Sequence, residues 1–390
     1  MNMKVFFRTF LKFLISLFPL KRNYIIFESY PELDGSPWMI YKEFIKRGFD
    51  KKYKLVWFVD ANYKAPNEIN SVVYFGNWNI FQKMYGCIII AKAKIIIDSN
   101  RYVKKIHSRT FRLHTRHGGT IKKADNYSNQ IGNVDYILSL SDEMANIEHS
   151  LVYKNSIIHR NQFLTLGYPN NDRLFDSTET SLRNLLRKQN LQFDKIIGWT
   201  PTFRRHRIGN RIDSAKTFSF GVPLFDCYDN IKQLNNMLHS KKIILIIKTH
   251  HSEMFDFKQK KLSNIIFLNQ VLEKEQNISI IDLIKSFDAL ITDYSSVYYE
   301  FLLLNRPIAL TIDDFEEYSS GTGFSIDYFD WIKGVYLKDI FDLMHFAEDV
   351  SNDIDSAKNE REKTLHRIYK YIDNHSTERV VDFLVNRAEL

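Results

Sequence analysis

Four short segments of the sequence combine basic or hydroxyl side chains with small residues, and each directly follows an apolar run. The first is His-Gly-Gly-Thr-Ile-Lys-Lys, which begins at His117. Its glycines, Gly118 and Gly119, let the backbone turn sharply and approach a ligand closely. A histidine on such a turn can act as a general base near neutral pH, and Lys122 can meet an anion. The segment alone is also typical of an ordinary surface turn.

The second segment, 198–207, concentrates arginine directly after a strand-like run. Its sequence is Gly-Trp-Thr-Pro-Thr-Phe-Arg-Arg-His-Arg, in which Thr202 and Arg204 are candidate binding residues. The planar guanidinium of arginine presents a fork of N–H groups that suits phosphate oxygens. A solvated basic loop is the alternative interpretation.

The third segment, Lys248-Thr249-His250-His251, ends the apolar run IILIIK. It places cationic and titratable groups where a strand would leave the sheet. Zinc is conceivable, but adjacent histidines are a poor pair for one tetrahedral metal, and no cysteine pair or HExxH pattern accompanies them. Anion binding by Lys248 and His250 is the favoured interpretation.

The fourth segment, Asp293-Tyr294-Ser295-Ser296, stands between an apolar strand and a helical pattern. Asp293, Ser295 and Ser296 suit the start of a helix, where free N–H groups and hydroxyls can bind an anion. Plain capping of the helix is the alternative, and the two roles are compatible. Further along, the acidic run 313–317 could hydrogen-bond the hydroxyls of a polyol or ribose.

Short apolar runs alternate with helical patterns, which predicts buried parallel strands joined by helices. In the first half the strand-like runs are 24–29, 53–59, 72–75, 95–99, 111–115 and 134–140. In the second half they are 196–200, 243–248, 265–268, 289–292 and 308–311, and the last helical pattern covers 364–390. The charge-rich segment 176–194 separates the two series. We expect two Rossmann-like α/β domains, 23–175 and 176–390, that bind ligands beyond the carboxyl ends of their strands.

The N-terminal residues 1–22 have the pattern of an amphipathic helix. Lys4, Arg8 and Lys12 recur at every fourth position among phenylalanine, leucine and isoleucine residues. The apolar run is too short and too charged to cross a bilayer, and no signal-peptide cleavage pattern follows it. A basic helix lying in the membrane interface is the favoured interpretation, and a helix packed on the protein core is the alternative.

The composition narrows the class of protein. The chain has 390 residues, with 54 Lys+Arg and 46 Asp+Glu, hence a formal charge of +8. That excess is too diffuse to indicate a nucleic-acid partner. With 44% hydrophobic residues and only 14 glycines and 8 prolines, the chain is neither disordered nor of low complexity. Two isolated cysteines fit a reducing, cytoplasmic setting.

In this order, the segments resemble the signature of the CDP-glycerol glycerophosphotransferase family, the teichoic acid polyol-phosphate primases and polymerases. The matching segments are 117–122, 167–172, 201–204, 248–251, 293–296, 306–307 and 314–318. Three positions depart from the signature. Gly119 stands where the family has threonine, with Thr120 one place later, His251 stands where the family has proline, and Arg306 stands where lysine is common. The first two departures leave the identity of the polyol open.

The resemblance implies a two-domain, GT-B-like fold whose C-terminal domain binds the CDP-polyol donor and whose N-terminal domain serves the acceptor. His117 would be the base for the acceptor hydroxyl, and His250 would bind or protonate the departing phosphate. Asp293 would orient its loop. The donor diphosphate would be bound by a set drawn from all four segments: Gly118, Gly119, Lys122, Thr202, Arg204, Lys248, Asp293, Ser295 and Ser296. No metal or other cofactor is expected.

The sequence therefore predicts an enzyme that transfers glycerol phosphate or ribitol phosphate from a CDP-polyol, releasing CMP. The acceptor would be a lipid-linked saccharide of the undecaprenyl-diphosphate type, or a growing teichoic acid or capsule polymer. The enzyme would lie peripherally on the anionic, cytoplasmic face of the cell membrane. Two alternatives stay open: a GT-B glycosyltransferase using a nucleotide-sugar, and a non-catalytic membrane-surface protein that binds polymer.

Overall fold

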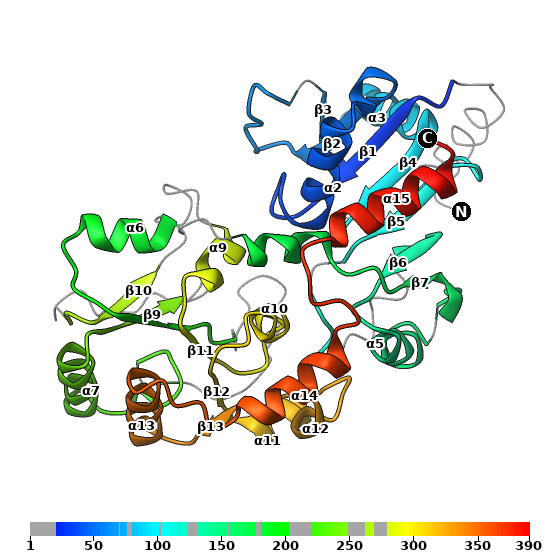
Figure 1. Ribbon diagram of the computed structural model, residues 1–390. Coiled ribbons are helices and arrows are strands. Elements are labelled where there is room, and N and C mark those ends of the chain that lie inside the picture. The colour runs from blue at the N-terminus through cyan, green and yellow to red at the C-terminus, as the bar shows by residue number, and fades with distance from the viewer. Residues whose placement is uncertain are drawn as a thin grey trace. The chain divides into compact units, whose positions relative to one another are not determined.

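The protein folds into two compact units. The computed structural model describes residues 21–69, 71–75, 80–100, 103–116, 118–123, 131–154, 156–176, 181–202, 218, 220–248, 262–268 and 279–390. Unit 1 comprises residues 1–117, 125–173 and 369–390, and unit 2 comprises residues 118–124 and 174–368 (Figure 1). Residues 1–20, which hold most of the expected amphipathic helix, lie outside the described residues.

Unit 1 is built on a seven-stranded parallel sheet in the order β3-β2-β1-β4-β5-β6-β7. Its strands are β1 Tyr24–Glu28, β2 Lys54–Asp60, β3 Val72–Phe75, β4 Ala93–Asp98, β5 Phe111–His114, β6 Tyr136–Leu138 and β7 Phe163–Leu164. In β2 five consecutive residues, 55–59, are buried. Continuous burial of this kind is what a parallel sheet requires when both of its faces are covered.

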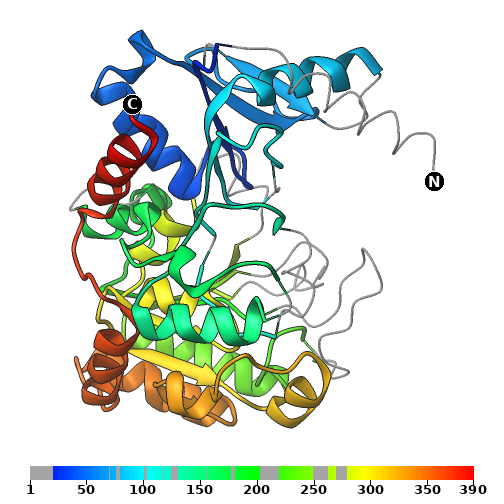
Figure 2. The same cartoon turned by 90° about the vertical axis from the view of Figure 1, so that its right-hand side faces the viewer.

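The helices of unit 1 include one from the C-terminal end of the chain. They are α2 Gly35–Lys46, α3 Ile80–Ala91, α5 Asp142–Ile147 and α15 Ser376–Ala388, with shorter helical turns at Phe49–Lys51, Glu148–Val152, Arg160–Gln162 and Pro169–Phe175. Figures 1 and 2 show the C-terminal helix α15 lying beside α2. Arg47 of α2 forms an ion pair with Asp382 of α15 at 2.5 Å.

The path of the C-terminus differs from the continuous domains 23–175 and 176–390 that the sequence suggested. Residues 369–390 pack in unit 1, and residues 118–124 pack in unit 2. The Asp172 carboxylate explains why residues 369–390 pack in unit 1. It accepts the backbone N–H groups of Ser376 at 3.0 Å and Thr377 at 2.7 Å. An acidic side chain accepts hydrogen bonds from the free N–H groups at the start of a helix and interacts favourably with the positive end of the helix dipole.

Unit 2 contains a six-stranded parallel sheet in the order β10-β9-β8-β11-β12-β13. The strands are β8 Lys195–Trp199, β9 Ile243–Lys248, β10 Ile265–Leu268, β11 Ala289–Thr292, β12 Ile308–Thr311 and β13 Val335–Leu337. The helices are α6 Ser181–Lys188, α7 Tyr228–Ser240, α9 Ile280–Lys285, α10 Val297–Leu302, α11 Phe315–Gly321, α12 Tyr328–Trp331, α13 Ile340–Ser351 and α14 Lys358–Ile368. Strands β8 and β9 and helices α7 and α13 share one apolar cluster, which includes Trp199, Leu234 and Phe346.

In both sheets the strand order reverses once, as in Rossmann-type folds. The reversal lies between β1 and β4 in unit 1 and between β8 and β11 in unit 2. Ligands of open parallel sheets bind beyond the carboxyl ends of the strands at such a reversal. The prediction of two Rossmann-like α/β domains is confirmed. Among the helices of the described residues, none has the length and apolar character to cross a bilayer.

Candidate active site

The strand reversal of unit 2 brings two of the predicted segments together. Thr200 directly follows β8, and Thr292 ends the neighbouring strand β11. The Thr200 N–H donates to the Ile291 carbonyl at 2.9 Å, and the Thr292 hydroxyl donates to the Thr200 carbonyl at 3.0 Å. These bonds extend the pairing of the two strands to the point where both loops begin.

Asp293 fixes the loop that follows β8. Its side chain is fully buried, and both carboxylate oxygens accept the Thr202 N–H at 2.9 Å. One of these oxygens also accepts the Tyr294 N–H at 2.6 Å, and the Tyr328 hydroxyl donates to the Asp293 carbonyl at 3.0 Å. Hydrogen bonds to a carboxylate are shorter and stronger than those between neutral groups. The geometry fits the loop-orienting role expected of Asp293, while its direct contact with a diphosphate stays a prediction.

The two serines lie where β11 gives way to α10. Ser295 and Ser296 are both partly exposed. The Val297 N–H donates to the Ser295 hydroxyl at 3.5 Å, whereas Ser296, the residue before the helix, makes no side-chain capping bond. The Ser296 hydroxyl is therefore not committed to capping α10, which is compatible with a role in binding.

Buried aromatic rings pack against one another where this loop begins. Tyr294 is fully buried and stacks on Tyr318, with ring centroids 4.1 Å apart. Its hydroxyl donates to Asp314 at 3.0 Å, and the Asp314 side chain is itself fully buried. Asp314 was a candidate for binding a polyol or ribose hydroxyl. The structure instead assigns it to Tyr294, because burial closes it to a ligand.

The glycine turn of the first segment packs against α10 within unit 2. A Cβ atom on Gly118 would lie 2.9 Å from the Ser296 hydroxyl oxygen. Only glycine, which has no side chain, lets the backbone approach this serine so closely. Gly118 has φ +105°, in the region that other residues rarely adopt. The Lys122 ammonium lies 5.7 Å from the centre of the Tyr318 ring. Predicted site residues from distant parts of the sequence are thus neighbours.

The remaining predicted residues are placed only in part. Lys248 ends β9, which neighbours β8, and it is partly exposed at the same carboxyl edge of the sheet. His117, Arg204 and His250 lie outside the described residues, so their roles stay predictions. Within the described ranges, no group of three or more His, Cys, Asp or Glu side chains could hold a metal ion.

Glu300 is a titratable neighbour of the site that the sequence analysis missed. It lies one helical turn beyond Ser296 on α10, and its Oε1 atom is 3.4 Å from the position that a Cβ on Gly118 would occupy. Burial raises the pKa of Glu300 to about 7, because the charged carboxylate loses water. The sequence offered one sign that Glu300 lies near the site. It is four residues after Ser296, and residues so spaced lie on one face of a helix.

A buried charge network stands at the carboxyl edge of the unit 1 sheet. Asp98, at the end of β4, contacts Arg112 at 2.7 Å and His114 Nδ1 at 2.8 Å, and all three side chains are fully buried. Burial opposes ionisation of Asp98, but Arg112 and His114 outweigh it and lower its pKa. Burial also lowers the pKa of His114, so its neutral ring donates Nδ1–H to Asp98.

This network fixes the end of β5, which precedes the first candidate segment. The Thr115 N–H and hydroxyl both donate to the Asp98 carbonyl, at 2.7 and 3.1 Å. Residue 115 is followed two places later by His117. These bonds hold the backbone of Thr115, which stands two residues before the predicted base in the sequence. Sequence reasoning missed this network, because its members are 14 to 16 residues apart and meet only through strand pairing.

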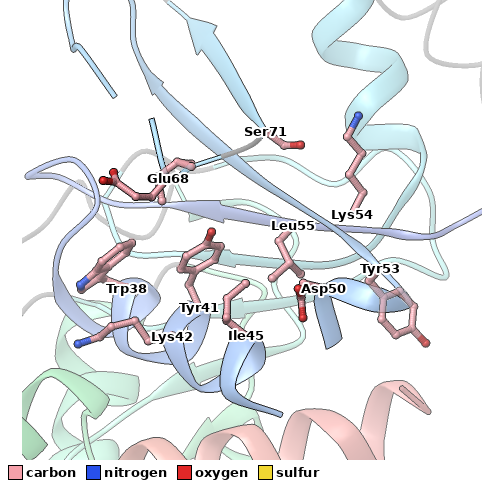
Figure 3. Close-up of a pocket in the computed structure, with 11 residues that line it drawn as sticks. Trp38, Tyr41, Lys42, Ile45, Asp50, Tyr53, Lys54, Leu55, Glu68 and Ser71 are labelled. Atoms are coloured by element: carbon pink, nitrogen blue, oxygen red, sulfur yellow. The ribbon is translucent and has the colours of Figure 1, made fainter. Parts of the chain in front are cut away.

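A cavity of about 510 Å³ in unit 1 lies away from these residues. Figure 3 shows Trp38 and Tyr41 of α2 on one side of it, with Leu55 of β2 nearby. Tyr53 and Lys54 also line it, which places it at the amino end of β2. None of the predicted site residues lines this cavity. Its size alone therefore does not identify the active site.

Comparison with known proteins identifies the family. Residues 10–386 match the family model of CDP-glycerol:poly(glycerophosphate) glycerophosphotransferase. The teichoic acid glycerol-phosphate primase of Bacillus subtilis (strain 168) is 29% identical over 255 residues, which are 65% of this chain and 58% of that protein. The teichoic acid poly(glycerol phosphate) polymerase of Bacillus spizizenii is 26% identical over 356 residues, 83% of each protein.

A solved structure shares the fold over the whole chain. The wall teichoic acid polymerase TagF superposes with a TM-score of 0.71 at 19% identity, covering 100% of this chain and 95% of that one. The likeness supports a GT-B-like fold made of two parallel-sheet α/β domains. The chain belongs to the CDP-glycerol:poly(glycerophosphate) glycerophosphotransferase family, a family of polyol-phosphate transferases.

Proposed function

We propose that the protein transfers glycerol phosphate, or ribitol phosphate, from a CDP-polyol to a lipid-linked saccharide or a growing teichoic acid or capsule polymer. The observation that carries the proposal is the meeting of segments at the strand reversal of unit 2. There the Thr202 loop, held by Asp293, stands beside the Ser295–Ser296 turn and the glycine turn at Gly118. Backbone N–H groups and hydroxyls at such a point suit the oxygens of a diphosphate.

The reaction needs little covalent chemistry from the protein. The oxygen of an acceptor hydroxyl would bond to the phosphorus that carries the polyol, and its proton would pass to His117. The bond between that phosphorus and the bridging oxygen of CMP would break, and CMP would leave with the electron pair. Positioning and electrostatic stabilisation supply most of the acceleration in phosphoryl transfer. Ser296, Lys248, Arg204 and His250 would supply the donors and positive charge on the phosphates.

Release of CMP tests the function directly. Purified protein would be incubated with CDP-glycerol, CDP-ribitol or UDP-sugars and a lipid-linked acceptor, and the product chain length would be read by mass. We expect CMP from one CDP-polyol, and a fall of roughly 10²–10⁴-fold in His117→Ala, the range of general base catalysis. His345→Ala, which alters an exposed histidine on α13, is the matched control. Full turnover by His117→Ala would remove that residue from its role, and transfer only from a UDP-sugar would contradict the function.

We also propose that the N-terminal segment holds the enzyme peripherally on an anionic membrane, at the cytoplasmic face. The support is the basic, phenylalanine-rich pattern of residues 1–20. Deleting these residues leaves Arg22, whose guanidinium donates to the Arg109 carbonyl at 2.7 Å, in place. The truncated protein should no longer sediment with vesicles containing phosphatidylglycerol, whereas the full chain should. Equal sedimentation of both forms would contradict the proposal.

A further inference from the structure

The six-residue segment 118–123, here called the strap, is fastened to unit 2 by backbone hydrogen bonds. The Lys123 N–H donates to the Gly323 carbonyl at 3.1 Å, and the Ser325 N–H donates to the Ile121 carbonyl at 2.9 Å. The Ser325 hydroxyl donates to the Lys122 carbonyl at 3.1 Å. These bonds attach the strap to unit 2, although the chain before residue 118 and from residue 125 to residue 173 belongs to unit 1.

Tyr299 of α10 fastens the other end of the strap. Its hydroxyl donates to the Thr120 carbonyl at 3.0 Å, and the whole side chain is buried. A Cβ atom on Gly119 would lie 2.1, 2.3 and 2.9 Å from three carbons of this ring. Separations below 3.0 Å do not occur between real atoms of this kind, so the ring occupies the space that any side chain at residue 119 would need.

Gly119 is also the position at which the chain departs from the resembled signature, which has threonine there. The Tyr299 ring explains the departure sterically, because it leaves no room for threonine. The ring fills the gap and then bonds the next residue, Thr120. The Tyr299 ring therefore fits in this position only because residue 119 is glycine.

We propose that Gly119 and Tyr299 form a positioning pair that fixes the strap to α10 and thereby holds two candidate donor-binding residues, Gly118 and Lys122, beside Ser296 and Tyr318 of unit 2. The donor-binding role of these residues rests on the proposed function. Consecutive Cα atoms are 3.8 Å apart, so Gly118 is one such step from Gly119. A displacement at residue 119 is thus passed directly to the Gly118 backbone that lies against Ser296. Misplacement of a positioning group by about 1 Å can cost roughly 10²-fold in rate.

The decisive experiment restores the signature threonine. Gly119→Thr should lower kcat/KM for the CDP-polyol by at least about 10²-fold. Combining it with Tyr299→Ala should recover at least about tenfold of the lost kcat/KM, because the second change makes room for the first. A Gly119→Thr variant with unchanged kcat/KM, or a double variant no better than Gly119→Thr, would overturn the proposal.

A second, milder variant guards against failure to fold. Tyr299→Phe keeps the ring and removes only the bond to Thr120, so backbone amide exchange of residues 120–123 should become faster. Tyr298→Phe is the matched control, because its hydroxyl also bonds backbone but does so at Lys333, outside the strap. Its exchange in residues 120–123 should equal that of the unmodified protein. Equal protection in Tyr299→Phe would contradict the anchoring.

The exchange measurement separates this proposal from the proposed function. It uses the protein without substrate, so it reports on the strap whether or not a CDP-polyol is turned over. Loss of protection in Tyr299→Phe together with no transfer by the unmodified protein would support the anchoring and contradict the function. Transfer by the unmodified protein together with unchanged protection in Tyr299→Phe would support the function and contradict the anchoring.

Discussion

The buried carboxylate of Asp293 accepts the backbone N–H of Thr202 through both of its oxygens, at 2.9 Å each. The two residues are 91 positions apart and follow neighbouring strands, β8 and β11. One acidic side chain therefore joins the two loops at the strand reversal of unit 2. The sequence analysis assigned Asp293 to an anion-binding turn. In the structure its carboxylate bonds the backbone of the loop that follows β8.

Replacing Asp293 by asparagine should destabilise the protein and loosen this loop. The amide group is neutral, and its nitrogen cannot accept an N–H, so the Thr202 or Tyr294 N–H loses a strong acceptor. We expect a loss of roughly 1–3 kcal/mol in the free energy of unfolding, measured by urea titration. Asp229→Asn, on the exposed first turn of α7, is the matched control. A stability equal to that of the control would show that the bonds to Asp293 contribute little.

Gly198, inside β8, should not tolerate alanine. A Cβ atom there would lie 2.0 Å from two carbons of the Phe287 ring, which is fully buried. Overpacking of a core commonly costs about 1–3 kcal/mol, and this contact is severe, so Gly198→Ala should lower the urea midpoint by at least that equivalent. The double variant Gly198→Ala/Phe287→Leu should recover part of the loss. If the loss of stability in the double variant equalled the sum of the losses in the two single variants, the steric explanation would be wrong.

Asp98 should be among the most sensitive positions of unit 1. Asp98→Asn leaves the Arg112 guanidinium fully buried without its carboxylate, and breaking a buried ion pair in this way costs about 3–5 kcal/mol. Urea or thermal unfolding measures the loss. Glu348→Gln breaks the exposed pair with Lys241 and should cost far less, because water screens that pair. Equal losses in the two variants would contradict the difference that burial makes.

Much of the fold could be predicted because apolar runs in a parallel sheet are continuous and local. The runs 243–248, 265–268, 289–292 and 308–311 coincide with β9, β10, β11 and β12. Strands β7 and β13 were missed, since two or three residues are too few to form a pattern. The helical pattern 364–390 proved to be two helices, α14 and α15. Nothing local in the sequence shows that α15 packs in unit 1.

Site residues could be predicted from the sequence where they directly follow a strand. They could not be predicted where tertiary contacts decide the role of a side chain. The sequence indicated Ser296 and Gly118 separately, and the fold makes them neighbours. It could not show that Asp314 is buried against Tyr294, because local sequence does not reveal which carboxylate a buried hydroxyl will bond. Glu300 was overlooked for the same reason: its pKa is raised by burial, which tertiary packing decides.

Glu300 should make stability fall as pH rises toward neutrality. Its pKa rises from the ordinary 4.5 to about 7, so between these values the folded protein binds more protons than the unfolded chain. The free energy of unfolding therefore decreases with increasing pH across that window, and the loss is complete above pH 7. Glu300→Gln removes the titrating group and keeps its shape. The variant should match the unmodified protein near pH 5 and exceed it in stability at pH 8, by urea titration. Glu317→Gln, on the exposed face of α11, is the matched control for the loss of one carboxylate. If the Glu300→Gln and unmodified curves stayed parallel from pH 5 to 8, the folded and unfolded states would bind equal numbers of protons at this site, and a pKa of about 7 for Glu300 would be wrong.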